Sequence, residues 1–260
     1  RALRLAPLWG RHIGLIHQRR STHRDRQGLL GSEEIVPASL MRSLAIIGLL
    51  VVAVGCGGKA TTAERVATHG EAVKARLSPA FAAQGVAYPP PSLTLIGLKA
   101  EKRLELWAPD AAGQPRLIKA YPILAASGGA GPKLREGDRQ VPEGLYAIES
   151  LNPNSRFHLA LRVNYPNADD RRRAQADGRT QLGGDIMIHG SNASIGCLAM
   201  GDPAAEELFV LAALTGPANI QVILSPVDFR QSDTVALPKG LPAWVPALHA
   251  QIKAELGRYH

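Results

Sequence analysis

Two residues able to act as nucleophile and base lie close together late in the chain, at His189 and Cys197. The apolar segment that begins at Ile186 and ends at His189 has the pattern of a strand, and a loop of small residues leads on to Cys197. A neighbouring imidazole can take the proton of a thiol and so produce the thiolate that attacks carbonyl carbon. Gly190 and Gly196 permit tight backbone, which can point N–H groups at a developing oxyanion. The pattern therefore indicates a candidate cysteine nucleophile with a histidine base.

Spacing alone leaves two other interpretations of these residues open. An inert, buried Cys197 beside a core histidine would give the same pattern, because free cysteine is among the most buried residue types. A zinc site would need more ligands, and the nearby candidates have no recognised ligand spacing; they are His158, Asp185 and Asp202. We expect no metal and no cofactor, because covalent thiol catalysis needs none.

The elements that must position these residues predict an α+β fold that is mainly β. Short apolar runs between clusters of Gly, Pro, Asn and Asp predict strands. These runs are Leu93–Leu98, Leu104–Trp107, Leu117–Ala125, Gly144–Glu149, His158–Val163, Asp185–His189 and Asn219–Leu224. Helical spacing predicts helices over residues 61–85, 204–214 and 242–256. Asp202, followed by a proline, is the expected N-cap of the second helix.

The N-terminal segment has the pattern of an export signal. Met41 and Arg42 precede an apolar run from Leu44 to Gly55, which is shorter than the roughly 20 residues of a transmembrane helix. The run ends at Cys56, and residues 53–56 resemble a bacterial lipoprotein signal, whose cysteine is lipidated. A buried core element and an uncleaved anchor are the alternatives.

These patterns divide the chain into five expected parts. Residues 1–40 read as an unfolded upstream extension, 41–55 as the signal peptide, and 56–91 as the anchor with an N-terminal helix and linker. Residues 92–230 are the expected catalytic domain, and 231–260 a C-terminal helical extension.

The composition is that of a globular chain, with 260 residues of which 45% are hydrophobic and 20% charged. This excludes a disordered chain, a disulfide scaffold and a polytopic membrane protein. The formal net charge is +8, but residues 1–55 contain eight Arg and three acidic residues, so the remainder has 22 basic and 19 acidic residues. We therefore expect no nucleic-acid partner, since most of the excess charge lies in the segment read as unfolded.

The residues around the thiol resemble a known family. Ile188-His189-Gly190 followed by Ser194-Ile195-Gly196-Cys197 is similar to the active-site motif of the L,D-transpeptidase (YkuD-type) catalytic domain. Papain-like hydrolases have the opposite order, with Cys before His. Further segments between about residues 93 and 230 resemble the DpaA/YafK-like branch, the murein-lipoprotein amidases; among them are Leu104-Glu105-Leu106-Trp107, Pro142-Glu143-Gly144 and Asn164-Tyr165-Pro166-Asn167.

The resemblance implies a β-sandwich or roll with an embedded helix and flanking N- and C-terminal helices. It implies that Cys197 attacks the carbonyl on the L-centre of meso-diaminopimelate in a peptidoglycan stem peptide, with His189 as general base and acid. Ser194 and the amides at Gly196 and Cys197 would orient the imidazole and hold the oxyanion. The implied substrate-binding residues are His158, Gly190, Ser191 and Lys133, although a strand histidine at 158 and a solvated turn lysine at 133 are equal alternatives.

Two departures bear on the reaction. Ile195 and Ala199 stand where many family members have His and Arg, which favours cleavage of a lipoprotein–murein linkage over the transpeptidation that is the family's default. Expected partners are peptidoglycan stem peptides, a murein-linked outer-membrane lipoprotein, and the membrane through a lipid on Cys56. The expected location is the periplasm, at the outer membrane. An alternative of another class is a non-catalytic peptidoglycan-binding lipoprotein.

Overall fold

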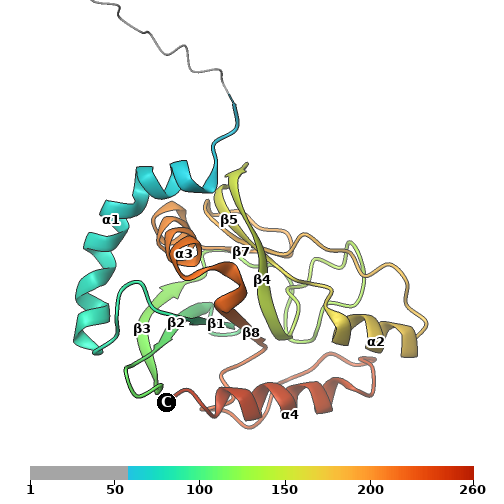
Figure 1. Ribbon diagram of the computed structural model, residues 1–260. Coiled ribbons are helices and arrows are strands. Elements are labelled where there is room, and N and C mark those ends of the chain that lie inside the picture. The colour runs from blue at the N-terminus through green and yellow to red at the C-terminus, as the bar shows by residue number, and fades with distance from the viewer. Residues whose placement is uncertain (1–57) are drawn as a thin grey trace, which may run out of the picture. The chain divides into compact units, whose positions relative to one another are not determined.

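A mixed sheet of eight strands organises residues 58–260, the part of the chain that this computed structural model describes (Figure 1). The strand order is β3-β2-β1-β8-β4-β5-β6-β7. The strands are β1 (Leu93–Leu98), β2 (Arg103–Pro109), β3 (Pro115–Pro122), β4 (Gly144–Ser155), β5 (His158–Val163), β6 (Met187–His189), β7 (Leu198–Ala199) and β8 (Ile220–Ser225). The expected extension at 1–40, the signal peptide at 41–55 and Cys56 lie outside the described residues.

Strand β4 joins the two halves of the sheet, because its two ends pair with different strands. Residues 144–147 pair with β8, whereas residues from Ile148 to Ser155 pair with β5. The expected strand ended at Glu149, but the ladder continues through Leu151 opposite Leu161 and Asn152 opposite Ala160. Pairing with β5 therefore outweighs the turn preference of the Asn and Pro residues in this segment.

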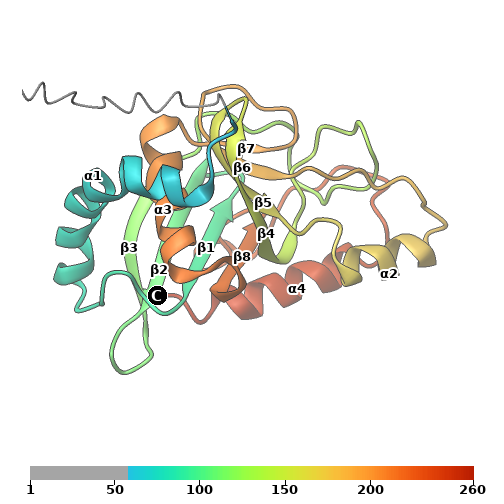
Figure 2. The same cartoon turned by 45° about the horizontal axis from the view of Figure 1, so that its top comes forward.

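Helices cover both faces of the sheet. They are α1 (Thr62–Ala83), α2 (Ala168–Ala176), α3 (Asp202–Thr215) and α4 (Val245–Leu256), with a 3₁₀ turn, η1 (Pro217–Asn219). Figures 1 and 2 show α1 and α3 packed together on one side and α4 along the other. None of the helices in the described range is long and apolar enough to cross a bilayer. The expected α+β class, with a dominant sheet, an embedded helix and flanking helices, is thus confirmed.

Alternation along β1 explains how one strand serves two cores, because successive side chains point to opposite faces of a sheet. Leu95 belongs to the larger hydrophobic core, together with Phe81 of α1 and Phe209 of α3. Ile96 belongs to the second core, together with Ile252 of α4. The C-terminal helix therefore closes the face of the sheet opposite α1 and α3.

The start of α3 differs from the sequence prediction. Gly201, with φ 78°, is the N-cap, and Asp202 is the first helical residue. The Asp202 carboxylate accepts a hydrogen bond from the Ser191 backbone N–H at 2.7 Å. Asp202 therefore fixes the loop after β6 and does not cap its own helix, while glycine supplies the left-handed backbone that precedes it.

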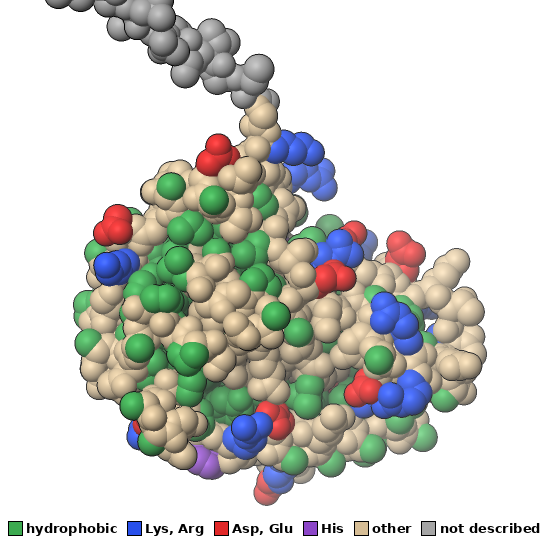
Figure 3. Space-filling view, viewed as in Figure 1, with side chains coloured by type: hydrophobic (Ala, Val, Ile, Leu, Met, Phe, Trp, Pro, Cys, Tyr) green, Lys and Arg blue, Asp and Glu red, His purple; other side chains and the backbone are tan. Residues whose placement is uncertain are grey.

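Helix α2 is an element that the sequence analysis did not predict. Its residues are strongly polar, so no apolar stripe marks it. A capping box at Asn167 and Asp170 starts it, and that signal is readable in the sequence. On the face shown in Figure 3, Lys and Arg side chains lie among Asp and Glu side chains, and this face carries no single-sign patch.

Candidate active site

Two short parallel strands bring the histidine and the cysteine together. In β6 and β7, which lie side by side in Figure 2, Ile188 pairs with Leu198 and His189 with Ala199. Cys197 directly precedes β7, so it lies beside Met187 at the start of β6. A strand of two residues is too short to show an alternation of apolar and polar side chains, so β7 could not be predicted from the sequence.

His189 is held in an orientation suited to a base. The residue is 1% exposed, and its Nδ1 lies 2.6 Å from the carbonyl oxygen of Gly190. Because a carbonyl only accepts, Nδ1 carries the proton, and Nε2 keeps a lone pair that can accept one. Burial lowers the pKa of His189, and the hydrogen bond to Gly190 offsets part of this effect. The imidazole is therefore neutral at neutral pH and available as a base.

Cys197 is in its protonated form at rest. Its Sγ accepts from the Met187 backbone N–H at 3.4 Å and donates to the Asp185 carbonyl oxygen at 3.4 Å. Burial raises the pKa of the Cys197 thiol, while the hydrogen bond from Met187 acts in the opposite direction. Among the described contacts, no hydrogen bond joins this thiol to the imidazole of His189. The resting pair is thus a neutral thiol and a neutral imidazole, and not an ion pair.

Hydroxyl groups clamp the backbone around the thiol. Ser194 Oγ donates to the carbonyl oxygen of Cys197 at 2.5 Å and accepts from the Cys197 N–H at 2.9 Å. Ser127 Oγ accepts from the Gly196 N–H at 2.6 Å. The Ser194 hydroxyl therefore positions the Cys197 backbone and makes no recorded contact with the imidazole. Both amides expected to hold an oxyanion are already bound to hydroxyls in this conformation.

The loop after His189 has a steric reason for its glycine. A Cβ at Gly190 would lie 2.5 Å from Asp202 Oδ1 and 2.8 Å from the carbonyl oxygen of Phe157. The next residue, Ser191, has φ 64° and gives its N–H to Asp202. Gly190 and Ser191 therefore shape the loop that leaves the histidine, and Asp202 of α3 holds it.

Two expected substrate-binding residues have other partners. Lys133 is 8% exposed, and its Nζ lies 2.6 Å from Asp138 Oδ1 and 2.9 Å from the carbonyl oxygen of Arg135. Lys133 is therefore not the solvated turn lysine of the alternative interpretation, and its positive charge acts to lower the pKa of the Cys197 thiol. His158 Nε2 lies 3.2 Å from Glu206 Oε1. The zinc candidates Asp185 and Asp202 bind Arg162 and Ser191.

Sequence reasoning assigned no contact with His189 or with the residues around Cys197 to Phe157 or to Ser127. Phe157 stacks on the His189 ring, with centroids 4.7 Å apart and an interplanar angle of 28°. Both residues lie far from Cys197 in the chain, and neither belongs to a motif with catalytic meaning. Phe157 does have one signal, an aromatic side chain in a turn that is otherwise polar.

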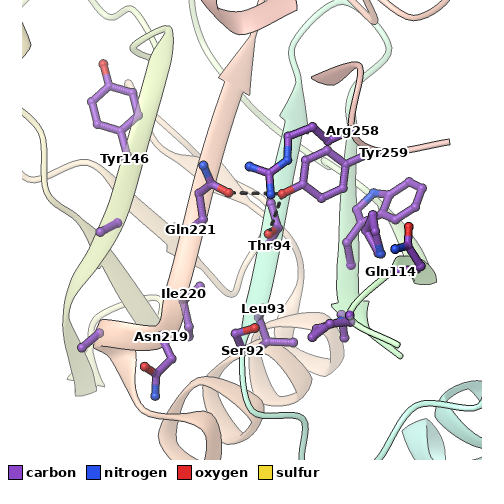
Figure 4. A pocket seen from close by; sticks show the side chains of 17 residues that line it. Ser92, Leu93, Thr94, Gln114, Tyr146, Asn219, Ile220, Gln221, Arg258 and Tyr259 are labelled. Carbon is purple, nitrogen blue, oxygen red and sulfur yellow. Dashed lines mark hydrogen bonds between the residues drawn. The ribbon is translucent and has the colours of Figure 1, made fainter. Parts of the chain in front are cut away.

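A separate cavity of about 840 Å³ is lined by residues of β1, β2, β8 and the C-terminal segment, and by none of β6 or β7 (Figure 4). Its lining includes Thr94 of β1 and Gln221 of β8, which both hydrogen-bond to the Tyr259 hydroxyl. None of its lining residues belongs to the segments around His189 and Cys197. We therefore assign it no part in the thiol chemistry.

A neutral imidazole at the end of β6 and a thiol just before β7, with hydrogen-bonded backbone around the thiol, form a candidate site for acyl transfer. Comparison with known proteins gives the family. Residues 95–222 match the family described as the L,D-transpeptidase catalytic domain (YkuD), and this domain of the chain belongs to that family.

The similar curated proteins are YafK of Escherichia coli K12 and YafK of Escherichia coli O157:H7, both named as candidate L,D-transpeptidases. Each is 40% identical over 140 residues, which cover 52% of this chain and 53% of YafK. The chain thus spans about half the length of the curated relatives that it matches.

Two solved structures are among the proteins that a structural comparison finds similar to this chain. One is Pgp2 of Campylobacter jejuni, described as a helical cell shape determining protein, with 17% identity, a TM-score of 0.42, and coverage of 65% of this chain and 70% of that one. The other is Bd1075 of Bdellovibrio bacteriovorus, with 18% identity, a TM-score of 0.40, and coverage of 68% and 59%.

Proposed function

We propose that the chain is a periplasmic cysteine enzyme that acts on peptidoglycan stem peptides containing meso-diaminopimelate. Cys197 is the nucleophile and His189 the general base and acid. The observation that carries this proposal is the parallel pairing of β6 with β7, since His189 ends β6 and Cys197 directly precedes β7, beside Met187 at the start of β6. Membership of the L,D-transpeptidase family supports the choice of a peptidoglycan peptide as acyl donor.

The reaction begins with proton transfer and attack. As the substrate carbonyl approaches, His189 Nε2 takes the proton of the Cys197 thiol, and Sγ forms a bond to the carbonyl carbon. Collapse of the tetrahedral intermediate breaks the C–N bond, and the imidazolium returns its proton to the departing amine. An amine or water then attacks the thioester, and the thiol is released.

The raised pKa of Cys197 and the lowered pKa of His189 mean that this proton transfer is uphill in the free protein. The proton therefore has to move during attack on the substrate, and not before it. The Gly190 carbonyl stabilises the imidazolium that forms, since it accepts the Nδ1 hydrogen bond. The Gly190 carbonyl thus does what the carboxylate of a Ser-His-Asp triad does, which is to accept the Nδ1 hydrogen bond of the catalytic histidine and orient its ring.

Within this reaction class we favour cleavage of the lipoprotein–murein linkage over 3-3 cross-linking. Ile195 is 77% exposed and Ala199 is buried, so neither position offers a hydrogen-bonding or charged side chain to a donor peptide. Lipid anchoring at Cys56 in the outer membrane would place the enzyme beside a murein-linked lipoprotein. This part of the proposal rests on the sequence pattern of residues 41–56.

Purified sacculi that carry covalently bound lipoprotein test both parts. We expect the protein to release lipoprotein and leave muropeptides without the linked Lys, as measured by mass spectrometry of the digested sacculi. New dimers joined through two diaminopimelate residues would instead show transpeptidation and contradict the preference for cleavage. Unchanged muropeptides with an intact, folded protein would favour the non-catalytic wall-binding alternative.

A further inference from the structure

Two histidines and a glutamate from three different elements meet outside the thiol site. They are His69 of α1, His158 at the first position of β5, and Glu206 of α3. One nitrogen or oxygen atom from each lies within 4.8 Å of the other two, and all three side chains are partly buried. The sequence shows no metal-ligand spacing here, because the fold alone brings the three residues together.

Two of the three distances between ligand atoms in this cluster match those of a tetrahedral metal site. Glu206 Oε1 lies 3.4 Å from His69 Nδ1 and 3.2 Å from His158 Nε2. Two ligands bound to Zn²⁺ at about 2.0–2.1 Å and at the tetrahedral angle lie roughly 3.4 Å apart. The distances from Glu206 Oε1 to the two histidine nitrogens therefore match the distance between two ligand atoms on the same zinc ion.

Neighbouring groups orient the glutamate for this role. Arg76 Nη2 bonds to Glu206 Oε2 at 3.1 Å, and its Nε bonds to Glu207 Oε1 at 2.8 Å. The guanidinium thus fixes the outer oxygen of Glu206 and leaves Oε1 facing the two histidines. Hydrogen bonds of this kind, made to the far side of a ligand, are what orients carboxylates in metal sites.

The His69 ring is poorly satisfied by the described protein groups. Its Nε2 is buried with no hydrogen-bond partner among them, and its Nδ1 meets Glu206 only at ion-pair distance. The His158 ring packs edge-on against it, with centroids 5.5 Å apart. A cation bound at Nδ1 would supply the interaction that holds His69 in this position.

We propose that His69, His158 and Glu206 bind one divalent transition-metal ion of the zinc class. Two imidazoles and a carboxylate are ligands that Zn²⁺ accepts, and water would take the fourth position. The ion ties α1, α3 and the β4–β5 turn together. Because Phe157 in that turn stacks on His189, the bound ion fixes the turn that supports the candidate base.

The test measures metal binding and needs no peptidoglycan substrate, so it is independent of the proposed reaction. The full chain without an affinity tag is stripped with EDTA, dialysed and titrated with ZnCl₂ by calorimetry. We expect one equivalent to bind, with a rise in melting temperature. His69→Asn and Glu206→Gln should each weaken binding at least about tenfold, since each removes one of three protein ligands.

Two further variants serve as controls. His260→Asn removes an exposed histidine outside the cluster, and Cys197→Ala removes the one thiol in the described part of the chain. Both should keep the single equivalent. Loss of binding in Cys197→Ala alone would place the zinc on the thiol and overturn the proposal, as would no stoichiometric binding in the native chain.

Substitution with Co²⁺ gives a spectroscopic readout of the number of ligands around the metal. We expect the visible absorption of four-coordinate cobalt in the native chain and in His260→Asn, and its loss in His158→Asn. Circular dichroism shows whether each variant is folded. Equal cobalt spectra in the native chain and in folded His158→Asn would contradict the site and leave only a hydrogen-bonded His–Glu–His cluster.

Discussion

Phe157 stacks on His189 with the two ring centroids 4.7 Å apart. The imidazole is therefore held on one side by this aromatic ring and at Nδ1 by the Gly190 carbonyl oxygen. Phe157 belongs to the turn between β4 and β5, whereas His189 ends β6, so a turn far away in the sequence sets the orientation of the candidate base.

Phe157→Ala should lower kcat by about 2- to 10-fold, because an aromatic pair contributes about 0.5–1.5 kcal/mol beyond its buried area. Phe157→Tyr keeps the stacked ring and is the matched control. Turnover of a soluble muropeptide at saturating substrate measures the effect. Native kcat in folded Phe157→Ala would show that the stack does not orient His189.

Ser194→Ala should reduce kcat by roughly 10- to 100-fold, since it leaves the N–H and C=O of Cys197 without their hydroxyl partner. Ser194→Thr retains the hydroxyl and should recover most of the rate. The two variants are compared by sacculus digestion at equal concentration of folded protein. Equal losses in Ala and Thr would mean that side-chain volume, and not the hydroxyl, matters here.

The pH dependence follows from the directions of two pKa shifts. Burial lowers the pKa of His189 below 6.5, so the neutral base persists to lower pH. The midpoint of the acid limb in a plot of kcat/KM against pH should therefore lie below pH 6.5. Burial raises the pKa of Cys197 above 9.0, so alkylation of the free protein by iodoacetamide should keep rising beyond pH 9. Fast alkylation of Cys197 at pH 6, lost in His189→Ala, would instead reveal a preformed ion pair.

The same shift of His189 affects folding stability. A histidine whose pKa is lowered in the folded state binds protons more weakly there than in the unfolded chain, so stability should fall as the pH drops through 6.5. Denaturant unfolding at pH 7.5 and 5.5 measures this change. His189→Gln should be less sensitive to pH over this range, and an equal slope in both proteins would assign the effect to other groups.

A buried charge network supports the loop that carries Ser127. Glu143 Oε1 lies 2.9 Å from Lys99 Nζ and accepts the Gly131 N–H, while Oε2 lies 2.8 Å from His249 Nε2 of α4. Lys99→Met should cost about 3–5 kcal/mol, since it leaves a buried carboxylate without its cation. Urea unfolding should show that Lys99→Met/Glu143→Leu is less destabilised than the sum of the single variants. Strict additivity would contradict this coupling.

Periodicity predicted most of the fold, because regular alternation survives wherever an element is long enough. Strands β1 and β5 have the expected bounds, and α1, α3 and α4 lie within a few residues of expectation. Elements shaped by pairing or capping were missed or misjudged. The far half of β4 depends on β5, and α2 depends on the cap at Asn167.

The order and chemistry of His189 and Cys197 pointed to the site, but its supporting groups could not be predicted from spacing. Ser127 reaches the Gly196 amide from a loop distant in sequence, and Phe157 reaches His189 from a turn. The pairing of Lys133 with Asp138, five residues later, could not be read from the sequence either. Such pairings depend on how loops fold back, which no local pattern records.

The central claim is that Cys197 forms a covalent acyl intermediate with a stem peptide. The most direct measurement is the intact mass of the protein after brief incubation with a tetrapeptide muropeptide and an acid quench. We expect one acyl group on the native chain, none on Cys197→Ala, and slower formation in His189→Ala. An adduct of equal yield on Cys197→Ala, or sacculus turnover by that variant at the native rate, would contradict the account.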